Sequence, residues 1–275
     1  VTPVRWFPER KGLITGIAAG GFGLAAVVLS TVAESLYNSG RTTLEIFRIT
    51  GLVYGIIIVG LSFLMSSPTS DDQSVTERIS QYWRQKNFIK LFMGIFAGTF
   101  AGLLVIGNLK PIGAGSGIDN HTLILGISVF AVSNFAGRIV WGFISDYTGS
   151  ALSIFIALSL QSAGIIILGH IHPGPAGYIL VSALIGFNFG ANFVLFARET
   201  SHLFGIRNLS TLYPYVFLGY AIAGIFGPLT GGLIYDLYGN YQPATTIASI
   251  ISLAGGFLFL GEVINTQRKK NPRKK

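Results

Sequence analysis

An arginine lies deep inside an apolar segment of the sequence. Arg138 falls within residues 121–145, and Asn134 and Trp141 stand four positions before it and three positions after it. This spacing places the three side chains on one stripe of an α-helix. A guanidinium in an apolar segment is costly and normally faces a bundle interior or an aqueous cavity, where its planar fork can bind a carboxylate. The stripe therefore predicts a binding surface for a small organic anion.

Two other roles for Arg138 stay open at the level of the sequence. Its flexible side chain can extend to lipid headgroups near Ser145, with its stem buried and its charge in water. It can also form a structural ion pair with a carboxylate of helices that lie outside this chain. Only in the binding role does the planar shape of the guanidinium affect how tightly an anion binds.

Further polar and aromatic side chains occur at helical spacing in other apolar segments. Asn188 and Asn192 lie one turn apart, where they either contact the substrate or hydrogen-bond to neighbouring helices. Tyr220 is a candidate for lining a cavity, whereas Tyr213 is typical of an aromatic anchor at the membrane interface. The candidate substrate-binding residues are Arg138, Asn134, Trp141, Asn188, Asn192 and Tyr220.

Glycine and proline mark a helix that can act as a gate. Gly227, Pro228, Gly231 and Gly232 lie in one apolar segment, where a proline removes a backbone hydrogen bond and kinks a helix. The glycines predict close helix packing. Four-residue glycine spacing recurs in two other segments, at Gly12, Gly16 and Gly20 and at Gly94, Gly98 and Gly102.

Other kinds of chemistry find little support in the sequence. There is no Cys, no phosphate-binding G-x-x-x-x-G-K-[ST] motif, and no cluster of His, Asp, Glu or Ser typical of a catalytic centre. His170 and His172 stand beside Pro173, which is a poor indication of a metal site. All eleven carboxylates lie in loops or near the ends of apolar segments, so we expect no mid-membrane proton relay in this chain. The sequence predicts no enzyme, no cofactor and no metal site.

Composition requires a membrane environment for the elements that hold these residues. The 275 residues are 51% hydrophobic and only 11% charged, well below the charged share of soluble domains. The formal charge of +8 lies in loops and in a basic tail, so it does not indicate nucleic acid. Eight apolar segments are long enough to cross a bilayer, at 13–33, 46–65, 88–109, 121–145, 151–169, 176–197, 212–235 and 243–264.

The distribution of positive charge predicts the orientation of the chain. Fifteen of the nineteen Lys and Arg lie on one side of these spans, three lie on the other, and Arg138 lies within a span. By the positive-inside rule, both ends of this chain face the cytoplasm of a multi-pass cell-membrane protein. The polar segment 66–87 is then a cytoplasmic linker, which contains either a short amphipathic helix or a solvated charged loop.

Three segments resemble the major facilitator superfamily, in the same order as in that family. Residues 6–12 (WFPERKG) and 15–23 are similar to the loop between helices four and five and to helix five. Residues 137–149 resemble the end of helix eight and the loop motif after it, with Gly142, Asp146 and Gly149 at the motif positions. Residues 227–232 resemble the second half of helix eleven. The chain thus resembles helices five to twelve of a twelve-helix transporter.

Within that superfamily, the chain resembles the oxalate/formate antiporter and monocarboxylate transporter branch. The likeness rests on the Trp-Phe-Pro opening and on residues 134–138 (NFAGR). The chain departs from the branch at three places. Ser150 and Ala151 replace basic residues of the loop motif. Residues 220–224 hold no Lys, whereas oxalate transporters that resemble this branch have one in helix eleven. Asn134 stands where monocarboxylate transporters have an Asp. These departures argue against oxalate as substrate and against proton coupling through position 134.

The resemblance implies a domain organisation and a function. Residues 1–65 are expected to be the last two helices of an N-terminal bundle, 66–87 a linker, 88–264 a complete six-helix bundle and 265–275 a basic tail. The expected function is secondary transport of a small organic anion, with the lipid bilayer and four further N-terminal helices as partners. The alternative is a membrane sensor or scaffold that keeps the fold without transporting.

Overall fold

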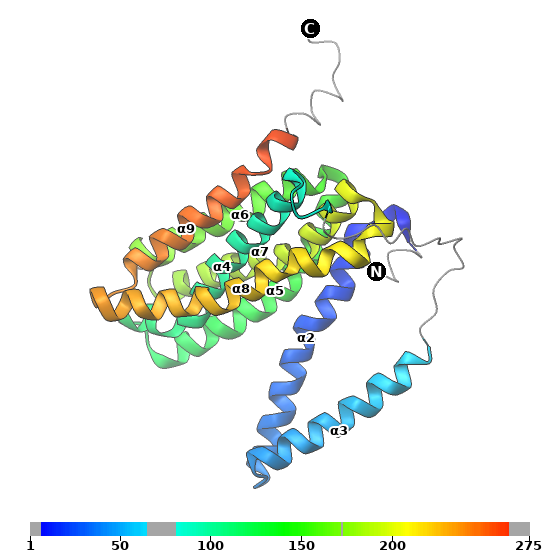
Figure 1. Cartoon of the computed structure of the whole chain (residues 1–275). Helices are drawn as coiled ribbons and strands as arrows, with labels where there is room; N and C mark the ends of the chain where they lie inside the picture. The colour runs from blue at the N-terminus through cyan, green and yellow to red at the C-terminus, as the bar shows by residue number, and fades with distance from the viewer. Residues whose placement is uncertain (1–6, 65–80, 172, 264–275) are drawn as a thin grey trace.

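The computed structural model describes residues 7–64, 81–171 and 173–263, and all regular structure in these ranges is helical (Figure 1). A π-helical turn, η3, continues helix α6 (Ser150–Ile166). In chain order the elements are η1 (Pro8–Arg10), α2 (Lys11–Asn38), α3 (Thr43–Ser62), α4 (Lys86–Gly115), α5 (Asn120–Thr148), α6 (Ser150–Ile166), η3 (Ile167–Ile171), α7 (Pro175–Phe204), α8 (Ile206–Tyr238) and α9 (Gln242–Phe257).

The helices confirm the predicted fold class. Seven spans among the described residues are long and apolar enough to cross a membrane: α3, α4, α5, α6 with η3, α7, α8, and α9 extended to Val263. The remaining predicted span coincides with α2, a helix of 28 residues. At about 1.5 Å per residue, α2 is longer than the ~30 Å hydrocarbon core. The chain is an all-α membrane protein of about eight transmembrane helices.

The helices extend beyond the apolar segments that predict them. The segment 176–197 becomes Pro175–Phe204, and 212–235 becomes Ile206–Tyr238. A hydropathy pattern ends at the first charged residues, but a helix continues wherever its polar side chains find partners inside the bundle. Residues 198–204 are therefore helical, although the sequence placed them in a loop.

Single glycines join consecutive helices at one end of the bundle. Gly149 links α5 to α6 with a φ of 86°, and Gly205 links α7 to α8 with a φ of 80°. This backbone region favours glycine because it has no Cβ. We call the end of the bundle that holds both junctions the Gly149 end. The other end, where α5 begins, is the opposite end.

Helices α4 to α9 form one six-helix bundle (Figure 1). The most extensive helix–helix contacts are between α5 and α7 and between α4 and α8. Backbones approach closely where α5 meets α7, since a Cβ on Gly137 would overlap the carbonyl oxygen of Phe187. At Gly94, Gly98 and Gly102 the prediction of close helix packing is corrected in its detail. Side chains of Phe259, Asn192 and Phe189, not a neighbouring backbone, fill the space beside them.

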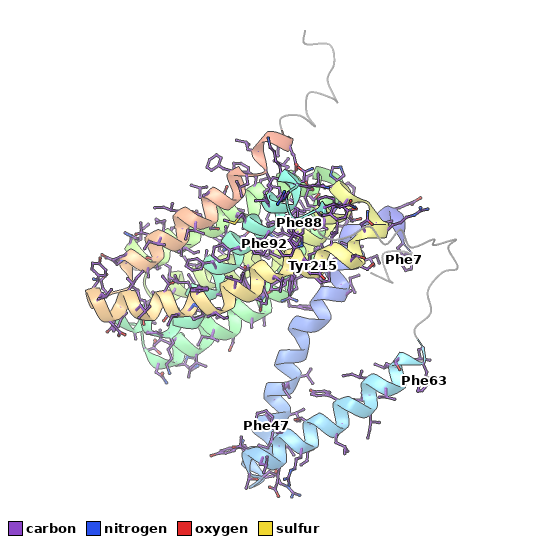
Figure 2. The ribbon with its side chains drawn as sticks, viewed as in Figure 1. Phe7, Phe47, Phe63, Phe88, Phe92 and Tyr215 are labelled. Carbon is purple, nitrogen blue, oxygen red and sulfur yellow. The ribbon has the colours of Figure 1, made fainter. Side chains whose placement is uncertain are left out.

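The two remaining helices, α2 and α3, leave the bundle as an arm (Figure 1). α2 packs against α5 near its start, where a Cβ on Gly16 would lie 2.5 Å from the carbonyl oxygen of Arg138. α3 packs against α2, and only 6% of its membrane-length window is buried. Figure 2 shows Phe47 on α3 and Phe63 directly after its end, both far from the bundle, and both rings are exposed.

The start of the bundle also anchors the end of the predicted linker. Tyr82 is buried with its ring 5.5 Å from that of Phe204, and the ring of Trp83 lies 5.3 Å from Phe88 and 5.9 Å from Tyr215. Of the linker predicted at 66–87, residues 66–80 lie outside the described residues, as does the basic tail at 265–275, and α4 already begins at Lys86.

Candidate functional site

The guanidinium of Arg138 is buried in the bundle and directed away from the Gly149 end. Arg138 lies in α5 with 3% of its surface exposed. Its Nε donates a hydrogen bond of 3.1 Å to Oδ1 of Asn134, one turn towards the opposite end. The side chain therefore runs back into the bundle. This direction is contrary to the one that an arginine reaching for headgroups near Ser145 would take.

Aromatic rings from two other helices enclose the Arg138 side chain. Its Cζ lies 4.0 Å from the ring centroid of Phe193 in α7, a distance typical of a cation–π contact. The Phe193 ring meets the ring of Tyr220 in α8 edge to face at 5.3 Å. Phe217 stacks on Tyr220 with centroids 4.9 Å apart. Helices α5, α7 and α8 thus form a charged and aromatic site around Arg138.

Tyr213 belongs to the same site and not to the membrane interface. Its hydroxyl donates a 3.1 Å hydrogen bond to the carbonyl oxygen of Phe193, and Arg138 interacts electrostatically with both Tyr213 and Tyr220. The expectation of an interfacial anchor at Tyr213 is wrong. The sequence could have indicated this position of Tyr213, because Tyr213, Phe217 and Tyr220 recur at helical spacing on one face of α8.

Trp141 lies in the core of the bundle. Its side chain is buried and its ring lies 6.2 Å from that of Phe187. It belongs to the core cluster near the Gly149 end, together with Leu195 and Phe196. Its Nε1 has no hydrogen-bond partner among the described residues.

Both members of the asparagine pair donate hydrogen bonds to their own helix. Asn188 and Asn192 are both buried in α7, and their Nδ2 atoms donate to the carbonyl oxygens of Leu184 and Phe189 on the same helix. Oδ1 of Asn192 lies against Gly98 of α4. Gln161 of α6 reaches the same place, since its Nε2 donates a 2.7 Å hydrogen bond to the Gly98 carbonyl. Asn192 thus lies where α4, α6 and α7 meet.

The glycine and proline segment of α8 packs along α4. A Cβ on Gly227 would lie 3.0 Å from the carbonyl oxygen of Phe100, and one on Gly231 would overlap the side chain of Asn108. The ring of Pro228 lies against Gly107, whereas Gly232 faces open space. α8 continues through Pro228 without interruption. Three of the four predicted packing residues therefore lie in the α4–α8 contact.

The loop motif holds the arm to the bundle at the Gly149 end. Asp146 accepts a 3.1 Å hydrogen bond from the backbone N–H of Leu13 in the first turn of α2. Its other oxygen lies 2.7 Å from Nη1 of Arg198, which also donates to Oγ of Ser145 at 2.7 Å. A carboxylate at a helix N-terminus is favoured by the helix dipole. We call these four residues the Asp146 clasp.

The other motif positions shape the backbone beside the clasp. The carbonyl oxygen of Gly142 accepts a 2.8 Å hydrogen bond from Oγ of Ser145, and Gly149 provides the turn into α6. The sequence missed Arg198 as a member because the apolar pattern stops at residue 197. The signal that could have found it is the lone Asp146 at a helix end, which needs a cation when it is partly buried.

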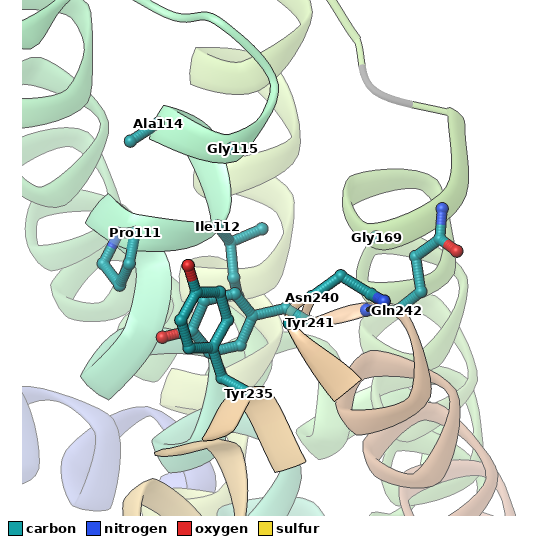
Figure 3. A pocket seen from close by; sticks show the side chains of 10 residues that line it. Pro111, Ile112, Ala114, Gly115, Gly169, Tyr235, Asn240, Tyr241 and Gln242 are labelled. Carbon is teal, nitrogen blue, oxygen red and sulfur yellow. Dashed lines mark hydrogen bonds between the residues drawn. The ribbon is translucent and has the colours of Figure 1, made fainter. Parts of the chain in front are cut away.

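A pocket of about 700 Å³ lies at the opposite end, away from Arg138 (Figure 3). The rings of Tyr235 and Tyr241 stack there at 4.6 Å. Burial, followed by the nearby Tyr235 and Asp236, raises the pKa of Tyr241. None of the lining residues is a predicted site residue: they are Pro111, Ile112, Ala114, Gly115, Gly169, Tyr235, Gly239, Asn240, Tyr241 and Gln242.

Comparisons with known proteins point to one family. Residues 3–213 match the model of the Major Facilitator Superfamily. The chain is 27% identical to an "Oxalate:formate antiporter" of Oxalobacter formigenes, covering 91% of this chain and 62% of the relative. It is 28% identical to an "Uncharacterized MFS-type transporter YhjX" of Escherichia coli, covering 81% and 57%. It is 22% identical to "Monocarboxylate transporter 13" of Bos taurus, covering 91% and 60%. The chain thus spans about three-fifths of the length of these relatives.

Proposed function

This chain belongs to the major facilitator superfamily of multi-pass membrane transporters, and we propose that it forms part of a secondary transporter for small organic anions. The family and its named relatives are transporters, so the chain is not an enzyme. Monocarboxylates are the substrate class that we propose. The observation that carries the proposal is the buried guanidinium of Arg138, which points into the bundle and lies between Asn134 and aromatic rings of α7 and α8.

The chemistry of this site suits a carboxylate attached to a small apolar group. A guanidinium stays charged when partly desolvated and can donate two parallel hydrogen bonds to a carboxylate. The rings of Phe193, Phe217 and Tyr220 provide apolar contact beside the charge, and the hydroxyl of Tyr220 can add a hydrogen bond. Residues 220–224 contain no Lys that could balance a second negative charge. A singly charged substrate therefore fits better than a dicarboxylate.

The names of two relatives agree with an anionic substrate. One is an oxalate:formate antiporter and the other is a monocarboxylate transporter. Their identity to this chain is below 30%, so the resemblance supports the substrate class and not a particular compound. Exchange of one anion for another requires no proton-coupling group, which fits Asn134 in place of an aspartate.

The proposed mechanism is alternating access between two bundles. The six-helix bundle of α4 to α9 is the C-terminal half, and α2 with α3 belongs to the N-terminal half, which four further helices complete. The two halves rock about a substrate held near the midplane. The Asp146 clasp ties α2 to α5 and α7, so it is suited to hold the halves together at the Gly149 end while the opposite end is open.

In this proposal the Gly149 end and both chain ends face the cytoplasm, as the positive-inside rule predicts from the charge of the loops. Gly227, Pro228 and Gly231 lie along the α4–α8 contact. In this proposal, small changes in the packing of these two helices open or close the path of the substrate. The lipid bilayer covers the remaining apolar surface.

Transport assays on the whole protein in liposomes test this proposal. We expect uptake of a labelled monocarboxylate that accelerates when the liposomes are preloaded with an unlabelled monocarboxylate, and no uptake with Arg138→Ala. A matched control is Arg48→Ala, which changes an exposed arginine of α3. The absence of uptake for a panel of small carboxylates, with correctly inserted protein, would favour a non-transporting sensor or scaffold instead.

A further inference from the structure

The pocket at the opposite end of the bundle has no part in the proposed transport of an anion. Its volume of about 700 Å³ lies within the ~300–1,000 Å³ that is typical of small-molecule sites. Its walls come from the ends of α4, η3 and α8 and from the start of α9. None of the described residues that line it belongs to the Arg138 site or to the Asp146 clasp. The pocket is therefore a candidate site for a second kind of ligand.

Two stacked tyrosine rings lie at the centre of the pocket, below Pro111 and Ile112 in the view of Figure 3. The ring centroids of Tyr235 and Tyr241 are 4.6 Å apart, with 24° between the ring planes. Tyr241 covers one face of the Tyr235 ring, yet 44% of Tyr235 is exposed, so the rest of the ring can contact a ligand. The face of an aromatic ring carries partial negative charge and attracts cations.

Three helical elements end at the pocket. Residues 111–115 of α4, Gly169 of η3 and Tyr235 of α8 all line it from the ends of their elements, and Gly239 directly follows α8. The last carbonyl groups of a helix carry partial negative charge, which favours a cation beside them. A Cβ on Gly115 or Gly239 would meet nothing within 4 Å, so a ligand can approach the backbone at both positions.

The start of α9 offers little to an anion, although a helix N-terminus normally favours negative charge. The backbone N–H of Gln242 already donates a 3.0 Å hydrogen bond to Oδ1 of Asn240. The next residue, Pro243, has no backbone N–H to donate. The positive end of the α9 dipole is therefore the weakest of the four helix ends at the pocket as a source of hydrogen bonds.

The charged groups near the pocket also favour a cation. Asp236 of α8 interacts electrostatically with Tyr241. The described lining residues include no Lys, Arg or His. Lys110 precedes the lining segment of α4 but is exposed to solvent, and Nε2 of His170 lies 3.2 Å from Oγ1 of Thr246. The pocket thus combines aromatic rings, helix carbonyls and a nearby carboxylate.

We propose that this pocket binds the ammonium group of a small organic cation. The cation lies against the ring of Tyr235, while the carbonyl groups at the ends of α4 and α8 face its positive charge and Asp236 balances that charge from the rim. A dissolved organic ammonium and the choline headgroup of a phospholipid both carry this group. The site differs from the Arg138 site in the sign of the charge that it selects, and it does not rest on the proposed function.

Choline binding to the whole protein in a maltoside detergent tests the proposal, with saturation-transfer NMR as the measurement. The matched probe is dimethylbutanol, the uncharged isostere of choline, in which carbon replaces the nitrogen. A cation–π contact with supporting carbonyl groups predicts that choline binds at least about fivefold more tightly than the isostere. Equal affinity for both probes would show that the pocket selects apolar shape and not charge, and would overturn the proposal.

Substitutions at the pocket locate the binding. Tyr235→Leu should weaken choline binding at least about fivefold, whereas Tyr235→Phe, which keeps the ring, should retain it. Tyr147→Leu is the control, because Tyr147 is 72% exposed in α5 and lies near the Gly149 end. Asp236→Asn, which changes an exposed residue, should weaken binding about twofold and decides the matter if Tyr235→Leu does not fold. Equal choline affinity in the wild type, Tyr235→Leu and Asp236→Asn would overturn the proposal.

The same NMR measurement in nanodiscs identifies the source of the ammonium group. Weaker choline binding in phosphatidylcholine than in phosphatidylglycerol nanodiscs would assign the pocket to a lipid headgroup, which competes with the probe. Equal binding in both would assign it to a dissolved organic cation, and either result supports the ammonium site. The absence of choline binding in detergent and in both kinds of nanodisc would overturn it.

Discussion

The six-helix bundle and the arm of α2 and α3 are built from similarly apolar helices, yet they are packed very differently. In α7, 72% of the membrane-length window is buried, whereas in α3 the figure is 6%. The bundle helices also bury polar residues in pairs, as with Ser162 and Ser249. Hydropathy is therefore shared by both regions and does not distinguish the packed one.

The difference shows which part of the chain determines its own structure. The bundle supplies partners for its own backbones and charges, while the arm is attached mainly through the Asp146 clasp and the contact of Gly16 with α5. An apolar surface as open as that of α3 must be covered by lipid or by other helices.

Gly137→Ala should prevent folding of the bundle, whereas Gly55→Ala in α3 should be tolerated. A Cβ at position 137 overlaps the backbone of α7, but nothing lies within 4 Å of one at position 55. Overpacking against a backbone costs about 3 kcal/mol or more, and substitutions away from such contacts stay within about 0.5 kcal/mol. Thermal unfolding in detergent and folded yield measure both effects.

The Gly55 result separates two ways of covering the arm. Tolerance in the membrane-embedded whole protein means that lipid or loosely packed side chains cover this face of α3. A loss of stability as large as that of Gly137→Ala would show that another backbone lies against Gly55, and the arm would then be as tightly packed as the bundle.

Asp146→Asn should detach the arm from the bundle. The change removes the negative charge between Arg198 and the N-terminus of α2, and the uncompensated Arg198 costs about 3 kcal/mol in a partly buried position. Hydrogen exchange of the first turns of α2 should accelerate, while α9 keeps its protection. The control is Asp236→Asn, since this carboxylate of α8 is exposed. Unchanged exchange in α2 would show that helix packing alone holds the arm.

The sequence predicted the helices of both regions, but not their packing. Apolar length is a local property, so each segment from 46–65 onward coincides with a membrane-length helix. The partners of Asp146 lie on other helices, and no spacing along the chain indicates them. Polar residues such as Arg198 interrupt the apolar pattern without ending the helix, which is why α7 is longer than predicted.

The candidate site was predicted in part for the same reason. Arg138 and Asn134 share one helix face, so their contact follows from spacing. The approach of Phe193 and Tyr213 depends on how α7 and α8 cross α5, and this cannot be read from the sequence. Asn192, which also lies in an apolar segment, is directed towards α4, because a helix presents each side chain to a different neighbour.

Tyr213→Phe should have a smaller effect than the changes above. It removes the hydrogen bond to the Phe193 carbonyl but keeps the ring, which costs about 1 kcal/mol. If Phe193 positions Arg138, the apparent affinity for the anion should fall by up to about tenfold. Tyr147→Phe is the control, because this ring of α5 is exposed. Equal effects of the two changes would remove Tyr213 from the site.

Single cysteines should report the orientation with almost no effect on stability, and the absence of native Cys makes the background clean. Ser39→Cys lies in the turn between α2 and α3, and Glu9→Cys lies before α2. An impermeant thiol reagent added to intact cells should label position 39 and not position 9. Labelling of position 9 alone would reverse the orientation of both the arm and the bundle.

Arg138→Lys tests the central claim most directly, because it keeps the positive charge and removes the planar fork. Losing a charge-assisted hydrogen bond costs about 1.5–3 kcal/mol, so the affinity for a monocarboxylate should fall about ten- to hundredfold, with Arg138→Ala abolishing binding. The measurement is the apparent substrate affinity of the whole protein at matched expression, with Arg48→Lys as the control. An affinity and rate unchanged by Arg138→Lys would contradict the account and remove Arg138 from the anion site.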